Sequence, residues 1–141
     1  MSQVYQTADE GHHRKILFVC VENSNRSQMS QAFAKMLGSE HLEAFSAGSK
    51  PSGIVNARAI AAMQELGYDL TTHHSKSLEE VKVFAPFDVV ITMGCGDACP
   101  WMPATQFIDW EIPDPRDMAP DQFNNVRDLI REKVKCLVER W

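Results

Sequence analysis

The chain is 141 residues long, with 44% hydrophobic and 23% charged residues and a formal net charge of −5. This length favours one domain with a buried core, and the acidic balance argues against nucleic acid or an anionic membrane surface as a partner. No apolar run approaches the ~20 residues that span a bilayer, and the polar N-terminus lacks the apolar stretch of a secretory signal, so a cytoplasmic protein is expected.

The first part of the chain predicts a tail, a strand and a helix. Residues 1–14 are polar and are expected to form a flexible tail before a single domain over residues 15–141. Residues 15–19, KILFV, are a continuous apolar run that is typical of a buried strand. Residues 27–37 predict a helix that ends at Gly38. Its apolar stripe consists of Met29, Ala32, Phe33, Met36 and Leu37.

Strands and helices continue to alternate along the rest of the chain. The expected elements are, in chain order, a strand over residues 41–46, an alanine-rich helix over residues 56–66, a short helix over residues 77–84, a buried strand over residues 87–93, a strand over residues 106–109 and a helix over residues 121–140. The last helix is amphipathic. Its core-facing side chains are expected to be Phe123, Val126, Ile130, Val134 and Leu137.

This alternation is typical of an α/β fold, here a three-layer open sandwich in which a four-stranded parallel sheet carries helices on both faces. In open parallel sheets the ligand crevice lies beyond the carboxyl ends of the strands. Two polar segments, residues 20–26 and 94–100, directly follow predicted buried strands. They are therefore expected to open onto the same edge of the sheet.

The segment CVENSNRS leads from the first strand into the first helix. A helix N-terminus offers unpaired backbone N–H groups and the positive end of the helix dipole, which together favour an anion. The same field favours a thiolate at Cys20 over the thiol. The whole loop is therefore expected to bind an oxyanion, through Val21, Glu22, Asn23, Ser24, Asn25, Arg26 and Ser27.

Individual side chains of the loop have expected roles. Arg26 can hold two oxygens of a tetrahedral oxyanion in a bidentate fork, and Ser27 can donate its hydroxyl hydrogen to the Cys20 thiolate. Asn23 and Ser24 are expected to brace the loop through hydrogen bonds to the backbone. The alternative is that Cys20 is a small packed hydrophobe and the C-x5-R spacing a chance match. The strand before and the helix after favour the functional interpretation.

The stretch VCVENSNRSQMSQAF resembles the active-site loop of the low-molecular-weight protein tyrosine phosphatase superfamily. Within that superfamily it is most similar to the arsenate reductases built on the phosphatase fold. The similarity extends from Lys15 to the C-terminus and includes EAFSAGSKPSGIVNARAIAAMQELGYDL and FDVVITMGCGDACP, the latter of which resembles the second cysteine loop of the reductases. The resemblance implies that Cys20 is the nucleophile and that Arg26 holds the oxyanion.

The resemblance also implies a general acid, because an oxygen expelled from a tetrahedral oxyanion leaves easily only when it is protonated. The superfamily places this acid in an Asp-Pro pair before the final helix, which is Asp114 in WEIPDPRDM. Asp-Pro is also an ordinary turn. Phosphatases that recognise phosphotyrosine commonly carry aromatic residues after this pair, where Arg116 and Asp117 stand here. Trp101 or Trp110 could supply an aromatic wall, but both are expected to pack.

Two further cysteines, Cys95 and Cys99 in MGCGDACP, are implied to be redox thiols. A second thiolate that attacks the sulfur of a Cys20–arsenate adduct forms a disulfide and releases arsenite. The alternatives are a zinc half-site, which C-x3-C supports weakly, a static disulfide, which the cytosol disfavours, and two packed, inert cysteines. Cys136, in the final helix, is expected to be structural.

The chain departs from the thioredoxin-coupled reductases in the spacing of these cysteines. When Cys99 is matched to their final cysteine, Met93 stands at the intermediate position and Cys95 is displaced by two residues. Either Cys95 takes the intermediate role, or a small thiol resolves the adduct.

Many of these reductases also carry potassium near the loop. Asn23 and Ser46 match that site, but Gln31 and Ser77 stand where carboxylates would be expected. Potassium should therefore bind weakly or not at all, and no metal site is expected. The neighbouring pair of histidines, His73 and His74, is expected to lie on the surface or to cap a helix.

The sequence therefore predicts an arsenate reductase whose catalytic residues are Cys20, Arg26, Asp114, Cys99 and Cys95. No tightly bound cofactor is expected, and the reductant is an external thiol: thioredoxin, glutathione with glutaredoxin, or mycothiol. One alternative is a phosphatase that acts on phosphotyrosine or aryl phosphates, and another is a non-catalytic oxyanion or redox sensor. A monomer is expected, with an arsenate or phosphate-like oxyanion as substrate and no nucleic-acid or membrane partner.

Overall fold

The computed structural model describes residues 14–38, 40–94 and 102–140. Residues 1–13 of the expected flexible tail lie outside these ranges, as do Cys95, Cys99 and Trp101. Within the described ranges, no helix is long and apolar enough to cross a membrane.

Four strands form one parallel sheet, which confirms the predicted α/β architecture. They are β1 (Arg14–Cys20), β2 (Leu42–Gly48), β3 (Phe87–Thr92) and β4 (Ala104–Asp109), and their order in the sheet is β2-β1-β3-β4. The first strand begins one residue earlier than expected and the last strand two residues earlier. Since β4 is an edge strand with mostly exposed side chains, its sequence pattern indicated only its last four residues.

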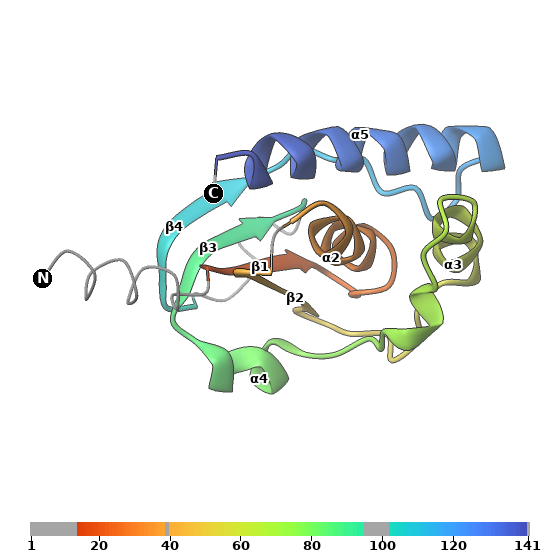
Figure 1. Ribbon diagram of the computed structural model, residues 1–141. Coiled ribbons are helices and arrows are strands. Elements are labelled where there is room, and N and C mark those ends of the chain that lie inside the picture. The colour runs from red at the N-terminus through yellow and green to blue at the C-terminus, as the bar shows by residue number, and fades with distance from the viewer. Residues whose placement is uncertain (1–13, 39, 95–101, 141) are drawn as a thin grey trace, which may run out of the picture.

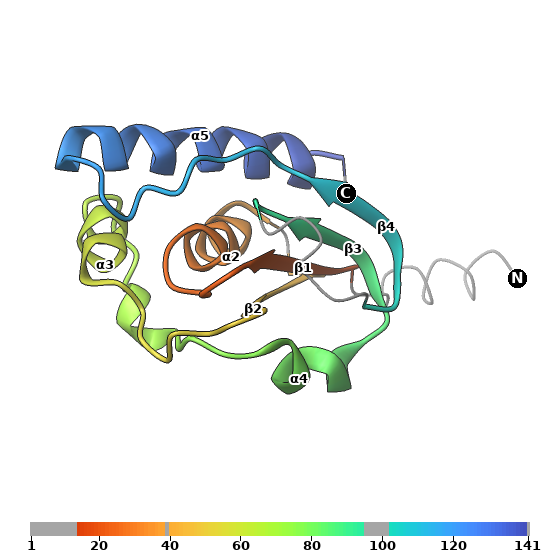
Figure 2. The same cartoon turned by 180° about the vertical axis from the view of Figure 1, so that it is seen from behind.

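Helices cover both faces of the sheet, which confirms the three-layer prediction. They are α2 (Arg26–Leu37), α3 (Ala57–Gln64), α4 (Leu78–Val81) and α5 (Pro120–Val138), with short 3-10 helices at Leu70–Thr72 and Lys82–Phe84. Figures 1 and 2 show α2, α3 and α5 on one side of the sheet and α4 on the other. The single helix expected over residues 77–84 is instead one α-helical turn followed by a 3-10 turn.

The larger part of the core lies between the sheet and the three helices α2, α3 and α5. All five side chains predicted to line the core side of α5 are buried. On α2 the prediction holds for Met29, Ala32 and Phe33 but is wrong for Met36, which is 39% exposed because the last turn of α2 is only partly covered.

The first nine residues of α2 are buried on every side, polar residues included. This happens because the helix contacts β1 and β2 on the sheet side and α3 and α5 on the others. Its buried polar residues are Arg26, Ser27, Gln28, Ser30 and Gln31. Buried polar groups need hydrogen-bond partners, so the start of α2 carries a polar network inside the protein.

The order of the strands places a ligand crevice at the end of β1. The chain passes from β1 to β2 on one side and returns to β3 on the other side of β1. Open α/β sheets bind ligands at such a switch in strand order, beyond the carboxyl ends of the strands. The loop after β1 and Gly94 after β3 lie at this edge, as the sequence predicted.

Candidate active site

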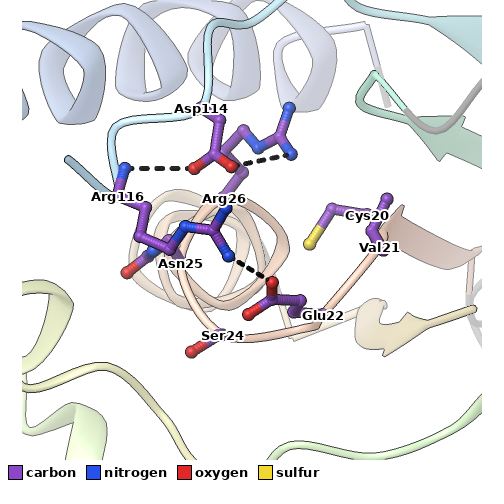
Figure 3. A pocket seen from close by; sticks show the side chains of 8 residues that line it. All are labelled: Cys20, Val21, Glu22, Ser24, Asn25, Arg26, Asp114 and Arg116. Carbon is purple, nitrogen blue, oxygen red and sulfur yellow. Dashed lines mark hydrogen bonds and ion pairs between the residues drawn. The ribbon is translucent and has the colours of Figure 1, made fainter. Parts of the chain in front are cut away.

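A cavity of about 190 Å³ lies at the carboxyl end of β1, against the loop that enters α2. Figure 3 shows the side chains that line it: Cys20, Val21, Glu22, Ser24, Asn25, Arg26, Asp114 and Arg116. All of them except Arg116 are site residues predicted from the sequence. The structure therefore brings the loop after β1 and the segment before α5 together around one space.

The backbone of the loop is held from outside by the segment that follows β2. Backbone N–H groups between Ser49 and Asn56 donate hydrogen bonds of 2.8–3.3 Å to loop carbonyls. The accepting carbonyls belong to Cys20, Val21, Glu22 and Ser24. Because the C=O and N–H of a trans peptide point in opposite directions, the N–H groups that follow these carbonyls are directed away from this segment, toward the cavity side. Such a row of N–H groups favours an anion.

Gly48, the last residue of β2, allows the loop to lie this close. A Cβ atom at Gly48 would be 2.5 Å from the Val21 carbonyl oxygen and 2.9 Å from the Asn23 nitrogen. Asn23 itself has a φ of 50°, a left-handed conformation that asparagine tolerates better than most residues. The tight curve of the loop thus depends on one residue without a side chain and on one asparagine.

Cys20 is buried at the end of β1, and its Sγ lies 2.9 Å from Ser27 Oγ. Asn23 Nδ2 donates to the same Oγ at 2.7 Å. The Ser27 oxygen accepts from Asn23, and its hydrogen can be donated to Cys20 when that sulfur is a thiolate, which can only accept. Ser24 Oγ donates to the Ile54 carbonyl at 2.7 Å, so both Asn23 and Ser24 hold the loop in place.

Arg26 is the first residue of α2, and its guanidinium is buried between backbone groups. Nη1 donates to the Ile112 carbonyl at 3.0 Å. Gly94, with a φ of 75°, lies against the same nitrogen, since a Cβ atom there would be 2.7 Å from Nη1. Nη2 lies 4.0 Å from Asp114 Oδ2 (Figure 3). One edge of the guanidinium is thus fixed by the fold, and the group also lines the cavity.

Asp114 lies on the segment between β4 and α5, with about half of its side chain exposed. Its Oδ1 accepts the backbone N–H of Arg116 at 3.0 Å, which fixes the turn. Arg58 of α3 donates to the carbonyls of Arg116 and Met118 at 3.1 and 2.7 Å, and so ties this segment to the body of the protein. A carboxyl group that reaches both solvent and the cavity can supply a proton there.

Arg116 is a cavity residue that the sequence analysis did not assign to the site. Its side chain forms an ion pair with Glu22 at 2.5 Å, which joins the Asp114 segment to the loop after β1 (Figure 3). Trp110 packs in the core, with its ring centroid 6.0 Å from that of Phe18, and does not line the cavity. Trp101 lies outside the described residues. Among the described residues, the exposed rim of the cavity is therefore charged and not aromatic.

Of the three cysteines other than Cys20, Cys136 alone lies in the described part of the chain. Cys95 and Cys99 lie outside the described residues, and the predicted redox loop lies there with them. Met93, at the intermediate position of the relay, is fully buried, and Ser30 Oγ donates to its sulfur at 3.4 Å. Cys136, which is expected to be a structural residue beside the apolar stripe of α5, lies beside that stripe and is exposed.

The residues compared with a potassium site are hydrogen bonded to one another and to Lys76. Ser46 Oγ donates to Gln31 Oε1 at 2.6 Å and accepts from Lys76 Nζ at 3.1 Å. Asn23 Oδ1 accepts the backbone N–H of Lys76 at 2.9 Å, whereas Ser77 caps α4. Burial lowers the pKa of Lys76 from 10.5 to about 8. An ammonium group, mostly protonated at neutral pH, therefore lies beside Ser46.

The two histidines agree with the expectation of surface or capping residues: His74 is exposed, and His73 is the C-cap residue of the 3-10 helix Leu70–Thr72. The His73 ring is partly buried, with Nδ1 2.9 Å from Gln28 Oε1 and Nε2 2.6 Å from the Tyr68 hydroxyl. Burial is the largest cause that lowers the pKa of His73 from 6.5 to about 4, and charges at Lys35 and Lys76 add to it. The imidazole is therefore neutral at pH 7.

Comparison with known proteins agrees with this geometry. A family profile described as low molecular weight phosphotyrosine protein phosphatase matches residues 15–140. The chain is 37% identical over 130 residues to a glutaredoxin arsenate reductase from Synechocystis sp., which covers 90% of this chain and 98% of the relative. It is 34% identical over 131 residues to arsenate reductase 1 from Staphylococcus epidermidis, which covers 90% of this chain and 97% of the relative.

A solved structure of an arsenate reductase in the phosphate binding state superposes on this fold with a TM-score of 0.81. Its sequence is 37% identical, and the match covers 90% of this chain and 98% of that chain. The family profile and the curated relatives thus agree over nearly the whole length of the protein. The chain belongs to the low-molecular-weight phosphotyrosine protein phosphatase family.

Proposed function

We propose that the protein is an arsenate reductase in which the Cys20 thiolate attacks arsenate. The observation that carries this proposal is the arrangement around one cavity at the end of β1. There the Ser27 hydroxyl lies 2.9 Å from Cys20 Sγ, and Arg26 lies 4.0 Å from the Asp114 carboxylate. Relatives named arsenate reductases, which match about nine-tenths of the chain, support arsenate as the oxyanion.

In the first step, the Cys20 sulfur forms a bond to As(V) while the loop N–H groups and Arg26 hold the arsenate oxygens. One As–O bond breaks, and Asp114 gives its proton to the departing oxygen, which leaves as water. A thiolate at Cys20 can only accept, so the Ser27 hydroxyl donates to it across the 2.9 Å contact and stabilises it before the attack. The product is a covalent Cys20–arsenate adduct.

The second step requires another thiolate, which attacks the Cys20 sulfur. A disulfide forms, and the S–As bond breaks with both electrons going to arsenic, so that As(V) leaves as arsenite, As(III). A phosphate adduct does not readily accept this electron pair and instead waits for water. An external thiol then reduces the disulfide and restores Cys20.

The second thiol is proposed to be Cys99 or Cys95, or a small thiol in their place. A disulfide relay through position 93 is excluded, because the thioether of Met93 cannot form a disulfide. The name of the cyanobacterial relative points to glutathione with glutaredoxin as the reductant to test first, before thioredoxin and mycothiol. Cytoplasmic conditions, which keep thiols reduced, suit such a cycle.

The rim of the cavity favours arsenate over an aryl phosphate. Arg116 and Glu22 place two opposite charges at the exposed rim, where a phosphotyrosine ring would need an apolar wall. Trp110, which could have supplied such a wall, is packed against Phe18. The phosphatase alternative therefore lacks an aromatic partner among the described residues.

The test supplies the purified full-length protein with arsenate and NADPH, coupled to glutathione, glutaredoxin and glutathione reductase. Parallel reactions contain the thioredoxin system or the mycothiol system, and each is followed by NADPH consumption and by arsenite formed. Cys20→Ser should abolish arsenite formation with every reductant. Cys136→Ser is the matched control, because that exposed thiol lies on α5 outside the cavity, and it should keep wild-type activity.

Two more variants separate the routes of the second step. Loss of activity in Cys99→Ser or Cys95→Ser with every reductant would assign the disulfide to that cysteine, whereas activity with glutathione in both variants would assign it to the small thiol. Absence of arsenite with all three reductants, beside brisk hydrolysis of p-nitrophenyl phosphate, would overturn the proposal in favour of a phosphatase. Absence of both activities with selective peroxide oxidation of Cys20 would point to a sensor.

A further inference from the structure

The first turn of α3 contacts both parts of the active site. The backbone N–H of Asn56, which caps α3, donates to the Ser24 carbonyl of the loop after β1 at 3.2 Å. Two residues later, the Arg58 side chain donates to the segment that carries Asp114. We propose that Arg58 is a positioning residue, which holds Asp114 where it can give its proton to the departing oxygen. The inference rests on the proposed function, in which Asp114 is the acid.

Arg58 makes two hydrogen bonds with a single nitrogen. Its Nη1 donates to the Arg116 carbonyl at 3.1 Å and to the Met118 carbonyl at 2.7 Å. A guanidinium Nη carries two hydrogens, so each carbonyl can receive one of them. The turn between these carbonyls is closed by the Met118 N–H, which donates to the Pro115 carbonyl at 3.0 Å. Arg58 therefore holds the whole turn over residues 115–118 against the start of α3.

The contact with this turn reaches Asp114 through the backbone of Arg116. The Arg116 N–H donates to Asp114 Oδ1 at 3.0 Å (Figure 3), and the Arg116 carbonyl accepts from Arg58. Within the described part of the chain, this N–H is the only hydrogen-bond donor to the Asp114 carboxylate, since Arg26 stays at 4.0 Å. The direction of the carboxylate thus depends on one peptide N–H, and Arg58 holds the carbonyl of the same residue.

The place of Arg58 in its helix does not favour a cation. Arg58 is the second residue of α3, beside the positive end of the helix dipole, and the first turn has no acidic residue to offset its charge. An arginine at this position weakens the start of the helix. The two carbonyls, which belong to residues 58 and 60 positions further along the chain, are the contacts that compensate for this placement.

The side chain of Arg58 holds the Asp114 segment, whereas the residues around it hold the oxyanion loop. The Asn56 side chain accepts the Arg58 backbone N–H at 2.8 Å, and the Asn56 N–H contacts Ser24. A substitution at Arg58 keeps both of these backbone groups. It should therefore release the acid and leave the oxyanion loop in place, which lowers the rate of the chemical step without weakening the binding of the anion.

The first test measures hydrogen exchange in the full-length protein by mass spectrometry of its peptides. Arg58→Met removes every donor of the side chain and keeps an unbranched apolar stem. The amides of residues 116–119 should exchange about tenfold faster in this variant, which corresponds to the loss of one or two net hydrogen bonds. Exchange in the peptide that contains residues 20–26 should stay as in wild type.

Arg131→Met is the matched control for the exchange test. Arg131 is an exposed arginine on α5 that does not line the cavity. Its substitution removes the same chemical group at a position away from the Asp114 segment. Exchange in both peptides should therefore stay as in wild type.

The second test measures arsenite formation with the reductant that supports it best. In Arg58→Met, kcat/KM for arsenate should fall by about ten- to a hundredfold, since a displacement of about 1 Å can cost up to about a hundredfold. The inhibition constant of inorganic phosphate should change by less than about twofold, because the oxyanion loop keeps its contacts. In an Asp114→Asn background, Arg58→Met should lower kcat/KM no further, because no proton remains to be positioned.

Equal losses of kcat/KM from Arg58→Met in the two backgrounds would overturn the proposal, because Arg58 would then not act through Asp114. Unchanged exchange of residues 116–119 in folded Arg58→Met, as judged by circular dichroism and the melting curve, would overturn it as well. If wild type forms no arsenite with any reductant, the proposed function fails, and the exchange comparison alone decides whether Arg58 holds the segment. If Arg58→Met does not fold, Arg58→Ala, which adds no group at this exposed position, replaces it in both tests.

Discussion

Arg26 Nη2 and Asp114 Oδ2 lie 4.0 Å apart across the active-site cavity, although the two residues stand 88 positions apart in the sequence. This separation is too long for a direct hydrogen bond, so both groups remain available to an oxyanion. Arg26 is fixed by the Ile112 carbonyl, and Asp114 by the turn to Arg116. A guanidinium that binds the oxyanion and a carboxyl group that supplies a proton therefore line the same cavity without a hydrogen bond between them.

Replacing Asp114 by asparagine should lower the rate of arsenite formation at saturating arsenate by about 10²–10⁴-fold, the usual contribution of a positioned acid. The substitution removes the proton but keeps an oxygen that can accept the Arg116 N–H, so the turn and the melting temperature should change little. Steady-state kinetics of arsenite formation and a thermal melt measure the two effects.

Asp117→Asn is the control for this prediction, because Asp117 belongs to the same segment but does not line the cavity. It should retain wild-type kinetics. Equal rates in Asp114→Asn and wild type would exclude Asp114 as the acid.

Gly94→Ala should damage the site through Arg26. The new Cβ would lie 2.7 Å from Arg26 Nη1, so the guanidinium must leave the Ile112 carbonyl. We expect a higher KM for arsenate and a lower kcat, because a displaced guanidinium loses its bidentate geometry. The substitution also costs about 1–2 kcal/mol of stability, because alanine is strained at a φ of 75°.

Gly67→Ala separates the strain from the clash. Gly67 has a φ of 85°, yet a Cβ there would meet nothing within 4 Å. This variant should lose comparable stability and keep its kcat/KM. A fall of kcat/KM in Gly67→Ala as large as that in Gly94→Ala would show that lost stability, and not Arg26, explains the effect.

Much of the fold could be predicted from the sequence, because the spacing of apolar residues and the positions of turn residues determine local structure. The continuous runs of β1 and β3 and the stripe of α5 each predicted an element that forms. The predictions fail where the burial of a side chain depends on neighbouring elements and not on the sequence of its own helix. Met36 follows the helical period but is exposed. The pattern of one helix does not reveal how far its neighbours cover it.

Only part of the site could be predicted from the sequence, for a related reason. Cys20 and Arg26 follow a strand and open a helix, so their spacing was enough to locate them. Gln28 and His73 stand 45 residues apart in sequence and meet only in the folded protein. A buried glutamine has no pattern of its own, since polar residues are normally counted as exposed. The signal that points to Gln28 in the sequence is its position in the first turn of the helix that follows the loop.

Arg116→Tyr should shift substrate preference toward aryl phosphates. The substitution breaks the ion pair with Glu22 and places a ring at the cavity rim. An added aromatic contact corresponds to about a two- to tenfold gain in kcat/KM for p-nitrophenyl phosphate relative to arsenate. Both partners are about half exposed, so the free energy of unfolding should change by less than about 1 kcal/mol.

Arg131→Tyr is the control for this prediction, because Arg131 is an exposed arginine on α5 that does not line the cavity. It should leave the ratio of the two kcat/KM values unchanged. The same ratio in Arg116→Tyr and wild type would contradict a role of the charged rim in excluding aromatic substrates.

His73 should make stability depend on pH below neutrality. Its folded pKa of about 4 lies below the unfolded value of 6.5, so between these values the unfolded chain binds more protons than the folded one. The free energy of unfolding then falls as pH drops from 6.5 toward 4, and this contribution is fully present above 6.5. The cause is burial of the ring, reinforced by Lys35, Lys76 and His74.

Urea unfolding of wild type and His73→Asn at several pH values measures this contribution as a difference. The advantage of wild type over the variant should be constant from about pH 7 upward and should shrink as pH falls from 6.5 toward 4. Carboxylates that titrate in the same range cancel in the difference, because both proteins carry them. His74→Asn should follow the wild-type curve, since that side chain is exposed. A difference independent of pH would show that His73 takes up its proton equally in the folded and unfolded protein.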